Sequence, residues 1–201
     1  MSDCGCHIEA KNKQQRKTLR VLLLINLVMF VVESITGVVA QSTALIADSL
    51  DMLADAIVYA ISLYVVGRSY LHKARAASLS GVFQITLAFL VLFDVVRKYW
   101  LGSLPESWLM GGIGLIALIA NIYCLWLISK HRNEEVHMRA SWIFSKNDVI
   151  ANISVIVAGI LVSIFNSGIP DLVVGFGIAA LVLWGGIKII QESRSFKEEN
   201  S

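Results

Sequence analysis

Six long apolar runs follow one another along the chain, and short polar stretches separate them. Each run is about 20 residues long, which is the length that an α-helix needs to cross the hydrocarbon core of a bilayer. Backbone groups in lipid must form their hydrogen bonds within the segment, so each run is expected to be a helix. The expected spans are Val21–Ala40, Leu45–Val66, Ala76–Val96, Trp108–Ile128, Trp142–Ile164 and Leu172–Ile190.

The polar stretches between the runs carry residues that favour turns. Pro105 follows a Gly-Ser pair and Pro170 follows an Asn-Ser-Gly triplet, so both prolines are expected in loops. The chain of 201 residues is 56% apolar and 16% charged, with a mean hydropathy of +0.69, whereas a soluble domain carries about a quarter charged residues. The sequence therefore predicts an all-α polytopic membrane protein with six transmembrane helices.

The basic residues are unevenly divided between the two ends of these spans. Of the seventeen lysines and arginines, all but Arg97 and Lys98 fall on the side that holds both termini, and the positive-inside rule makes that side cytoplasmic. Residues 1–18 are then a cytoplasmic arm without a secretion signal, residues 19–192 the transmembrane domain and residues 193–201 a short cytoplasmic tail. We expect a multi-pass protein of the cell membrane (inner or plasma membrane).

Composition and motifs exclude two other classes of protein. A net charge of +2 without a basic, aromatic-rich patch argues against nucleic acid as a partner. Neither HExxH nor GxSxG occurs, so we do not expect an enzyme. Three cysteines do not make a disulfide framework. The function is therefore expected in or at the bilayer.

Acidic residues interrupt the apolar runs. Asp48, Asp51 and Asp55 lie at i, i+3 and i+7 in the second run, which places them on one stripe of a helix. An acid in mid-span costs about 2.5–3.5 kcal/mol to insert and marks a functional site by default. The fifth run adds Asp148 with Asn152 four residues later, and the first run adds Asn26 and Glu33.

These acids have no basic partner in their own spans. No lysine or arginine occurs between Arg20 and Arg68 or between Lys146 and Lys188. Like charges this close in a medium of low dielectric must be protonated in part or must share a cation. A divalent metal ion meets this need while bound, and protons replace it when it leaves. For Asn26, Glu33 and Asn121 the alternative is a helix-packing hydrogen bond, and Asp94 is expected to pair with Arg97 and Lys98.

The string from Ser42 to Asp55 resembles the second span of the cation diffusion facilitator family of divalent-metal/proton antiporters. Its small residues precede an acid and then Asp51-x3-Asp55, where the family has His/Asp-x3-Asp. The resemblance implies an efflux carrier that works by alternating access, with a four-ligand metal site shared by the second and fifth spans. Further matching positions are Asn26, Glu33, Gly37, Asn121, Asp148, Asn152, Gly159 and Asp171.

Two features depart from the family pattern. Many zinc-transporting members read His-x3-Asp in the fifth span, but this chain has Phe144 four residues before Asp148. Asn152, Ser145, Asn147 or water is left to supply the fourth ligand, and an oxygen-rich site leaves cadmium, cobalt, iron and manganese open beside zinc. Typical members also carry a cytoplasmic metal-sensing domain that holds a dimer together. We expect this chain to be a short form without that domain, so a homodimer is expected to form through transmembrane contacts.

The N-terminus offers soft ligands in Cys4-Gly5-Cys6-His7, which suit zinc, cadmium or copper(I). The arm either captures metal or is a tail with incidental cysteines. The expected metal ligands are Asp51, Asp55, Asp148 and Asn152, with Asp48, Asn147, Ser145, Glu33, Cys4, Cys6 and His7 as accessory candidates.

The sequence predicts a secondary transporter that exports divalent, zinc-like cations from the cytoplasm in exchange for protons. Metal ion and protons are its substrates, the lipid bilayer is its surroundings, and no resident cofactor is expected. Two alternatives stay open: a passive channel that uses the same acids as a selectivity ring, and a membrane metal sensor without transport.

Overall fold

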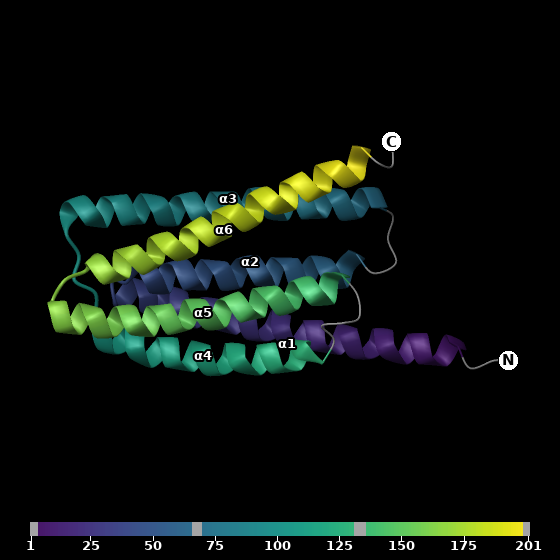
Figure 1. The fold of residues 1–201 in the computed structure, drawn as a ribbon, viewed down its shortest axis with the longest axis horizontal. Coiled ribbons are helices and arrows are strands. Elements are labelled where there is room, and N and C mark those ends of the chain that lie inside the picture. Colours follow the sequence, from purple (N-terminus) through teal and green to yellow (C-terminus); the bar gives the residue numbers. More distant parts are fainter. Residues whose placement is uncertain (1–3, 66–69, 131–135, 199–201) are drawn as a thin grey trace.

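Six α-helices make up the computed structural model of this chain. The structure describes the backbone of residues 4–65, 70–130 and 136–198, and the side chains of residues 13–61, 63, 78–130, 142 and 145–191. The helices are α1 (Cys4–Val39), α2 (Thr43–Val65), α3 (Tyr70–Leu101), α4 (Ser107–Ser129), α5 (Val136–Phe165) and α6 (Ile169–Glu198) (Figure 1).

The six predicted spans are all confirmed as helices, but four helices are longer than the spans. Helix α1 begins at Cys4, so the expected N-terminal arm is helical from that residue on, while its division from the transmembrane domain stays a prediction. Helices α3 and α5 begin six residues before their predicted spans, and α6 ends eight residues after its span. Hydropathy marks only the apolar part of a helix. The helical backbone continues beyond that part into polar sequence.

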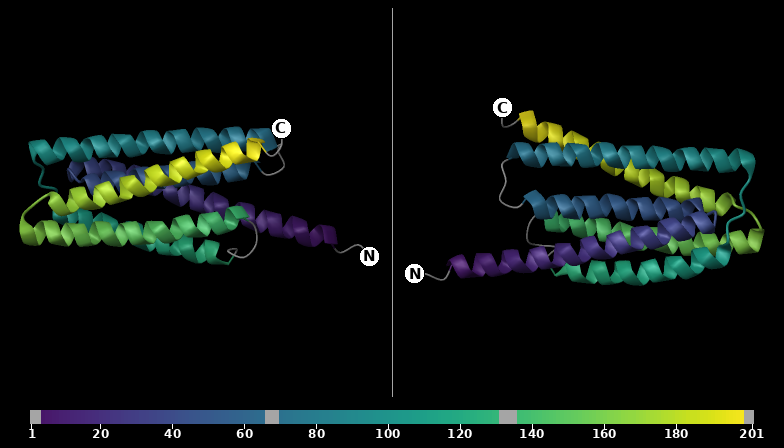
Figure 2. Two further views of the ribbon diagram at one scale, coloured as in Figure 1. Left: turned by 45° about the horizontal axis from the view of Figure 1, so that its top comes forward. Right: turned by 180° about the vertical axis from the view of Figure 1, so that it is seen from behind.

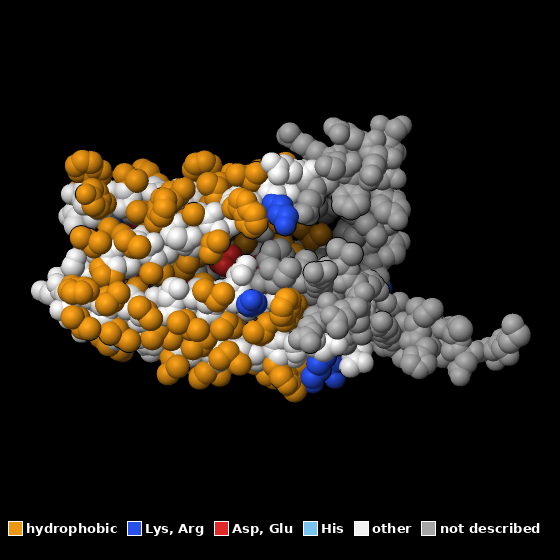
Figure 3. Space-filling view, viewed as in Figure 1, with side chains coloured by type: hydrophobic (Ala, Val, Ile, Leu, Met, Phe, Trp, Pro, Cys, Tyr) orange, Lys and Arg blue, Asp and Glu red, His pale blue; other side chains and the backbone are white. Residues whose placement is uncertain are grey.

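Five helices of the described chain are long and apolar enough to cross a membrane: α1, α3, α4, α5 and α6. Helix α2 is different because it carries three aspartates, yet it runs beside the others through the bundle (Figures 1 and 2). Large apolar side chains cover much of the outer surface (Figure 3). The chain is therefore an all-α, multi-pass membrane protein, as predicted.

Helix α2 lies at the centre of the bundle. It packs against α1, α3, α5 and α6, while α3 pairs with α6 and α4 pairs with α5. Both termini lie at one end of the bundle (Figures 1 and 2). This agrees with an even number of spans, and the cytoplasmic side of that end stays a prediction. We call the opposite end, with residues 40–42, 102–106 and 166–168, the far end.

Backbone conformations at the far end explain where the helices stop. Gly102 follows α3 with a φ of 76°, and Asn166 follows α5 with a φ of 48°, the left-handed conformation that commonly ends a helix. Pro105 lies in the loop, as predicted. The prediction for Pro170 was wrong, because it lies in the first turn of α6, where no intrahelical N–H bond is lost and proline is tolerated.

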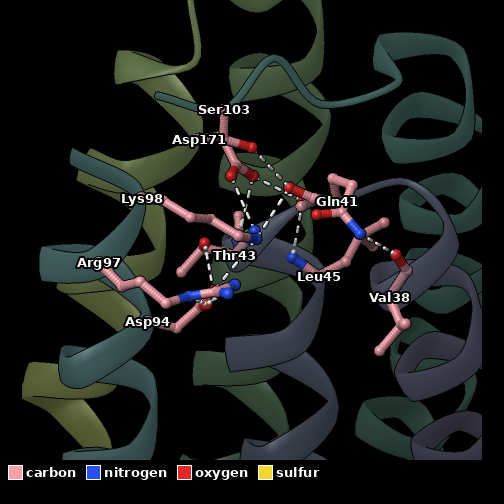
Figure 4. Close-up of polar contacts among 11 residues, drawn as sticks. Val38, Gln41, Thr43, Leu45, Asp94, Arg97, Lys98, Ser103 and Asp171 are labelled. Atoms are coloured by element: carbon pink, nitrogen blue, oxygen red, sulfur yellow. Dashed lines mark hydrogen bonds and ion pairs between the residues drawn. The ribbon is translucent and has the colours of Figure 1, made fainter. Parts of the chain in front are cut away.

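The first turn of α2 is capped by its own serine and by an acid from α6. Ser42 Oγ accepts a hydrogen bond from the Leu45 N–H at 3.1 Å. Buried Asp171 accepts hydrogen bonds from the backbone N–H groups of Thr43 and Ala44, at 2.8 and 3.0 Å, and from Ser42 Oγ at 2.5 Å (Figure 4). A helix start leaves such N–H groups without intrahelical partners and favours negative charge, so Asp171 fixes α2 to α6.

Helix α3 joins the same region through two charged residues. Lys98 Nζ donates to the Gln41 carbonyl at 2.9 Å and forms an ion pair with Asp94 at 3.1 Å. Asp94 also pairs with Arg97 at 2.9 Å, which confirms the predicted ion pair, and accepts a hydrogen bond from Thr43 Oγ1 at 2.8 Å. We call the contacts of Asp171, Asp94 and Lys98 with residues 41–44 the far-end clasp.

Two glycines allow α2 to approach its neighbours closely. A Cβ atom at Gly37 of α1 would lie 2.9 Å from Ile46 Cγ1, and one at Gly175 of α6 would lie 2.9 Å from Thr43 Cγ2. Gly175 is one turn after Asp171, so the residue that caps α2 and the residue that admits it share one face of α6. The clasp therefore depends on packing as well as on hydrogen bonds.

Replacing Asp171 tests the clasp. Asp171→Ala removes three hydrogen bonds to a carboxylate and leaves buried N–H groups unpaired, and it is expected to lower the free energy of unfolding by about 3–5 kcal/mol. Asp171→Asn should fall between this variant and the wild type. Glu106→Ala is the control, because Glu106 is exposed and its side chain caps no N–H group. Unfolding of the purified protein in detergent measures the difference, and equal stability of all variants would contradict the role of Asp171.

Candidate functional site

The acids that interrupt the apolar runs lie inside the bundle. Asp48 and Asp55 of α2 are 1% and 5% exposed, Asp148 of α5 is 2% exposed, and Glu33 of α1 is fully buried. Asp51 is half-buried. The stripe with the i, i+3, i+7 spacing on α2 thus faces largely inward, and α5 contributes its own buried acid.

A tyrosine links α2 to α5 next to Asp55. Tyr59 Oη donates a hydrogen bond to Asp55 Oδ2 at 3.2 Å and lies 3.4 Å from Ser145 Oγ. Tyr59 is fully buried, and the carboxylates of Asp55 and Asp148 both lie within electrostatic range of its hydroxyl. Cys124 of α4, a buried free thiol, lies within electrostatic range of the same two acids. These residues form the inner level of the site, which we define as Asp55, Tyr59, Cys124, Ser145 and Asp148.

A second set of polar contacts lies nearer the far end. Asn121 Nδ2 of α4 donates to Asn152 Oδ1 of α5 at 3.0 Å, and Asn152 Nδ2 donates to Asp48 Oδ2 at 2.6 Å. All three residues are buried, with exposed fractions of 1% or less. We call them the outer level. Three helices thus meet in one relay of hydrogen bonds that ends on a carboxylate.

The acids repel one another across these two levels. The charge of Asp148 interacts most strongly with that of Asp55, and also with those of Asp51, Asp48 and Glu33. Among the described residues, no three His, Cys, Asp or Glu side chains stand close enough to hold a metal ion between them. The acids of the two levels thus form a row of spaced carboxyl groups, and no basic side chain of the described residues pairs with them.

The structure separates the candidates for the fourth ligand. Ser145 lies at the inner level, beside Asp148 and across Tyr59 from Asp55. Asn152 lies at the outer level and is engaged by Asp48 and Asn121. Asn147 is exposed, in agreement with its rotation of about 100° from Asp148 on the helix. The side chains of Phe144, Cys4, Cys6 and His7 lie outside the described residues.

Sequence reasoning missed Tyr59 and Cys124. Tyr59 continues the aspartate stripe at the next i+4 position, and Cys124 is one turn after Asn121 on α4. Extending each stripe by one turn would have found both. The apolar pattern alone does not single them out, because tyrosine and cysteine do not interrupt an apolar run as an acid does.

An acidic side chain is visible on the surface between two helices. Figure 3 shows a small acidic patch between α5 and α6, within a surface that is otherwise largely apolar. Among the three aspartates of α2, Asp51 is the one that is not buried. Lys146 of α5 and Lys188 of α6 are exposed. The bundle thus does not enclose the row of acids on α2 completely.

Comparisons with known proteins match most of this chain to a family of cation transporters. Residues 19–195 match the family model of the cation efflux transmembrane domain. The chain is similar to the cadmium, cobalt and zinc/H(+)-K(+) antiporter of Bacillus subtilis (22% identical over 120 residues) and to the zinc transporter ZitB of Yersinia pseudotuberculosis (24% over 119 residues). Each match covers 59% of this chain but only 39% and 38% of the respective relatives.

The outer level gives a test with a matched control on the same helix. Asn152→Leu removes the donor to Asp48 and the acceptor of Asn121, and it should lower the free energy of unfolding by about 3 kcal/mol. Asn147→Leu makes the same change five residues earlier at an exposed position and should alter stability by less than about 0.5 kcal/mol. Unfolding in detergent measures both, and an equal effect of the two variants would contradict the relay.

Proposed function

Since the family model covers most of its length, this chain belongs to the cation efflux family, and we propose that it exports divalent metal cations from the cytoplasm in exchange for protons. The observation that carries the proposal is the line of buried acids on α2 and α5, with which no basic side chain of the described residues pairs. Insertion of such groups into lipid is costly. A transported cation and the protons that replace it both offset that cost.

The inner level supplies the ligands in this proposal. Asp55 and Asp148 are the acids whose charges interact most strongly across α2 and α5, and Asp51 is one turn from Asp55 on the same stripe. Repulsion holds these carboxylates apart, and a divalent ion supplies the attraction that draws them together. Ser145 is the neutral oxygen best placed to join them, because it already faces Asp55 through Tyr59.

This ligand set favours hard cations, which prefer oxygen ligands, over soft cations, which prefer sulfur ligands. Carboxylate and hydroxyl oxygens suit manganese, and also accept zinc, cobalt, iron and cadmium in the absence of competitors. The names of the relatives include cadmium, cobalt and zinc. We therefore propose a divalent transition-metal substrate, with the choice among metals set by the residue at the start of the α5 motif, Phe144.

Proton exchange follows from competition for the same oxygens. A carboxylate that holds a metal ion cannot hold a proton, and binding of the metal releases the protons. When the ion leaves towards the far end, protonation removes the repulsion among Asp51, Asp55 and Asp148. The empty carrier then returns without uncompensated charge in the membrane.

Removal of Asp51 tests the function. In proteoliposomes, Asp51→Ala is expected to abolish metal-dependent proton flux, because one of the three charged ligands is lost. Glu106→Ala changes an exposed acid at the far end and should retain the flux. A pH-sensitive dye inside the vesicles records protons while a metal indicator records the cation.

Three outcomes of that measurement contradict the proposal. Undiminished flux in Asp51→Ala removes the role of this acid. Metal flux that follows the membrane potential without saturating or moving protons identifies a channel. Metal binding without any flux in the wild-type chain identifies a sensor.

Phe144 provides a test of metal preference. Phe144→His adds an imidazole four residues before Asp148, on the same face of α5, and should raise the affinity for zinc relative to manganese about tenfold, or about 1.4 kcal/mol. Phe165→His places imidazole at the exposed far end of the same helix and should leave the ratio unchanged. Metal analysis of purified protein after equilibrium dialysis measures the ratio, and an unchanged ratio in Phe144→His would show that this position does not face the metal.

A further inference from the structure

Most of the buried polar atoms without a partner in the described chain are carboxyl or amide oxygens. Apart from Ser80 Oγ of α3, the fully buried side-chain atoms that lack a partner in the described chain are both carboxylate oxygens of Glu33 and single oxygens of Asn26, Asn121 and Asp148. Ionised carboxylates and amide oxygens are acceptors, and acceptors cannot satisfy one another. Each of these oxygens therefore needs a proton, a donor or a cation that the described residues do not supply, and this holds beyond the inner level as well.

Helix register places Glu33 opposite the outer level. Ser34 of α1 hydrogen-bonds Ser49 of α2 at 3.1 Å, and Gly37 meets Ile46. The two helices are antiparallel neighbours, so Glu33 lies level with the turn of α2 that carries Asp48. The charge of Glu33 accordingly interacts first with Asp48. Glu33 is fully buried, and neither of its oxygens has a partner within the described chain.

The amide relay leaves a further oxygen free at the same level. Asn121 Nδ2 donates to Asn152 Oδ1, and Asn152 Nδ2 donates to Asp48 Oδ2. Asn121 Oδ1 then has no partner, although Asn121 is fully buried. Asp48 of α2 thus lies within electrostatic range of Glu33 of α1 and is joined through Asn152 to Asn121 of α4, and none of these residues has a basic partner within the described chain.

The outer level is separate from the inner one. Asp48 and Asp55 are seven residues apart on α2, which is about 10.5 Å along the helix axis. Asp48 is nearer to the far end, where α2 begins. A cation at the outer level would thus share no ligand with one held by Asp55 and Asp148.

We propose that Glu33, Asp48 and Asn121 form a second divalent-cation site, between the inner level and the far end. Two carboxylates balance the charge of one divalent ion, and an all-oxygen ligand set selects a hard ion such as Mn²⁺. The proposal rests on the proposed function in one respect: the ion is the exported substrate, which the outer site receives from the inner level. In this proposal Glu33 is a ligand of the second cation, which explains why it forms no hydrogen bond between helices in the described chain.

Binding stoichiometry of Mn²⁺ tests the second site without any measurement of transport. The purified full chain, dialysed against saturating Mn²⁺, is expected to bind two ions per chain by elemental analysis. Glu33→Gln keeps the side-chain volume and removes the charge, and it should bind one ion. Asp148→Asn should also bind one, because it affects the inner level alone, and the double variant should bind none. Glu106→Gln, at an exposed acid, should bind two.

A wild-type chain that binds one ion, or a Glu33→Gln chain that binds two, overturns the second site. If Glu33→Gln does not yield folded protein, Asn121→Leu replaces it and should weaken the second binding event at least tenfold, while unchanged binding contradicts the proposal. The outcome is independent of the proposed export: two ions bound with no flux retain the second site and remove the exporter, whereas one ion bound with proton-coupled flux does the reverse.

Discussion

Lipid gives the interior of this bundle no water, so each buried oxygen must find a hydrogen-bond donor within the chain or hold an ion. Asp171 and Glu33 are both fully buried, yet they meet this constraint differently. Asp171 accepts three hydrogen bonds from the start of α2, whereas neither oxygen of Glu33 has a partner in the described chain. The first is therefore a structural acid, and the second is available to a ligand.

The helix that is least suited to contact with lipid is enclosed by the other helices. Helix α2 carries three aspartates, and it lies at the centre with α1, α3, α5 and α6 around it. The other helices present apolar side chains outward and polar ones towards α2, as Asn121, Ser145 and Asn152 do. Neighbouring helices supply Tyr59 and Asp48 with polar partners that the hydrocarbon cannot give. The apolar outer faces of the helices thus enclose a row of polar side chains along α2.

Periodicity predicted the fold well because an apolar run of 20 residues has few structural alternatives in a membrane. It placed six helices correctly and put Asp48 and Asp55 on one stripe of α2. It failed at Pro170, where the first turn of a helix admits proline, and hydropathy alone did not show that the polar residues from Cys4 onward are helical. Partners across helices, such as Asn152 with Asp48 and Tyr59 with Ser145, depend on tertiary register, which no single run encodes.

The clasp gives α2 a fixed pivot at one end. Thr43 is held there by Asp171 and Asp94, and Asp55 lies twelve residues away along a straight helix, about 18 Å at 1.5 Å per residue. In the proposed export cycle, such a helix would act as a lever arm. A rotation of about ten degrees around the pivot would move the Asp55 carboxylate by roughly 3 Å, about the diameter of a water molecule, while the serine and backbone contacts at the pivot would hardly move.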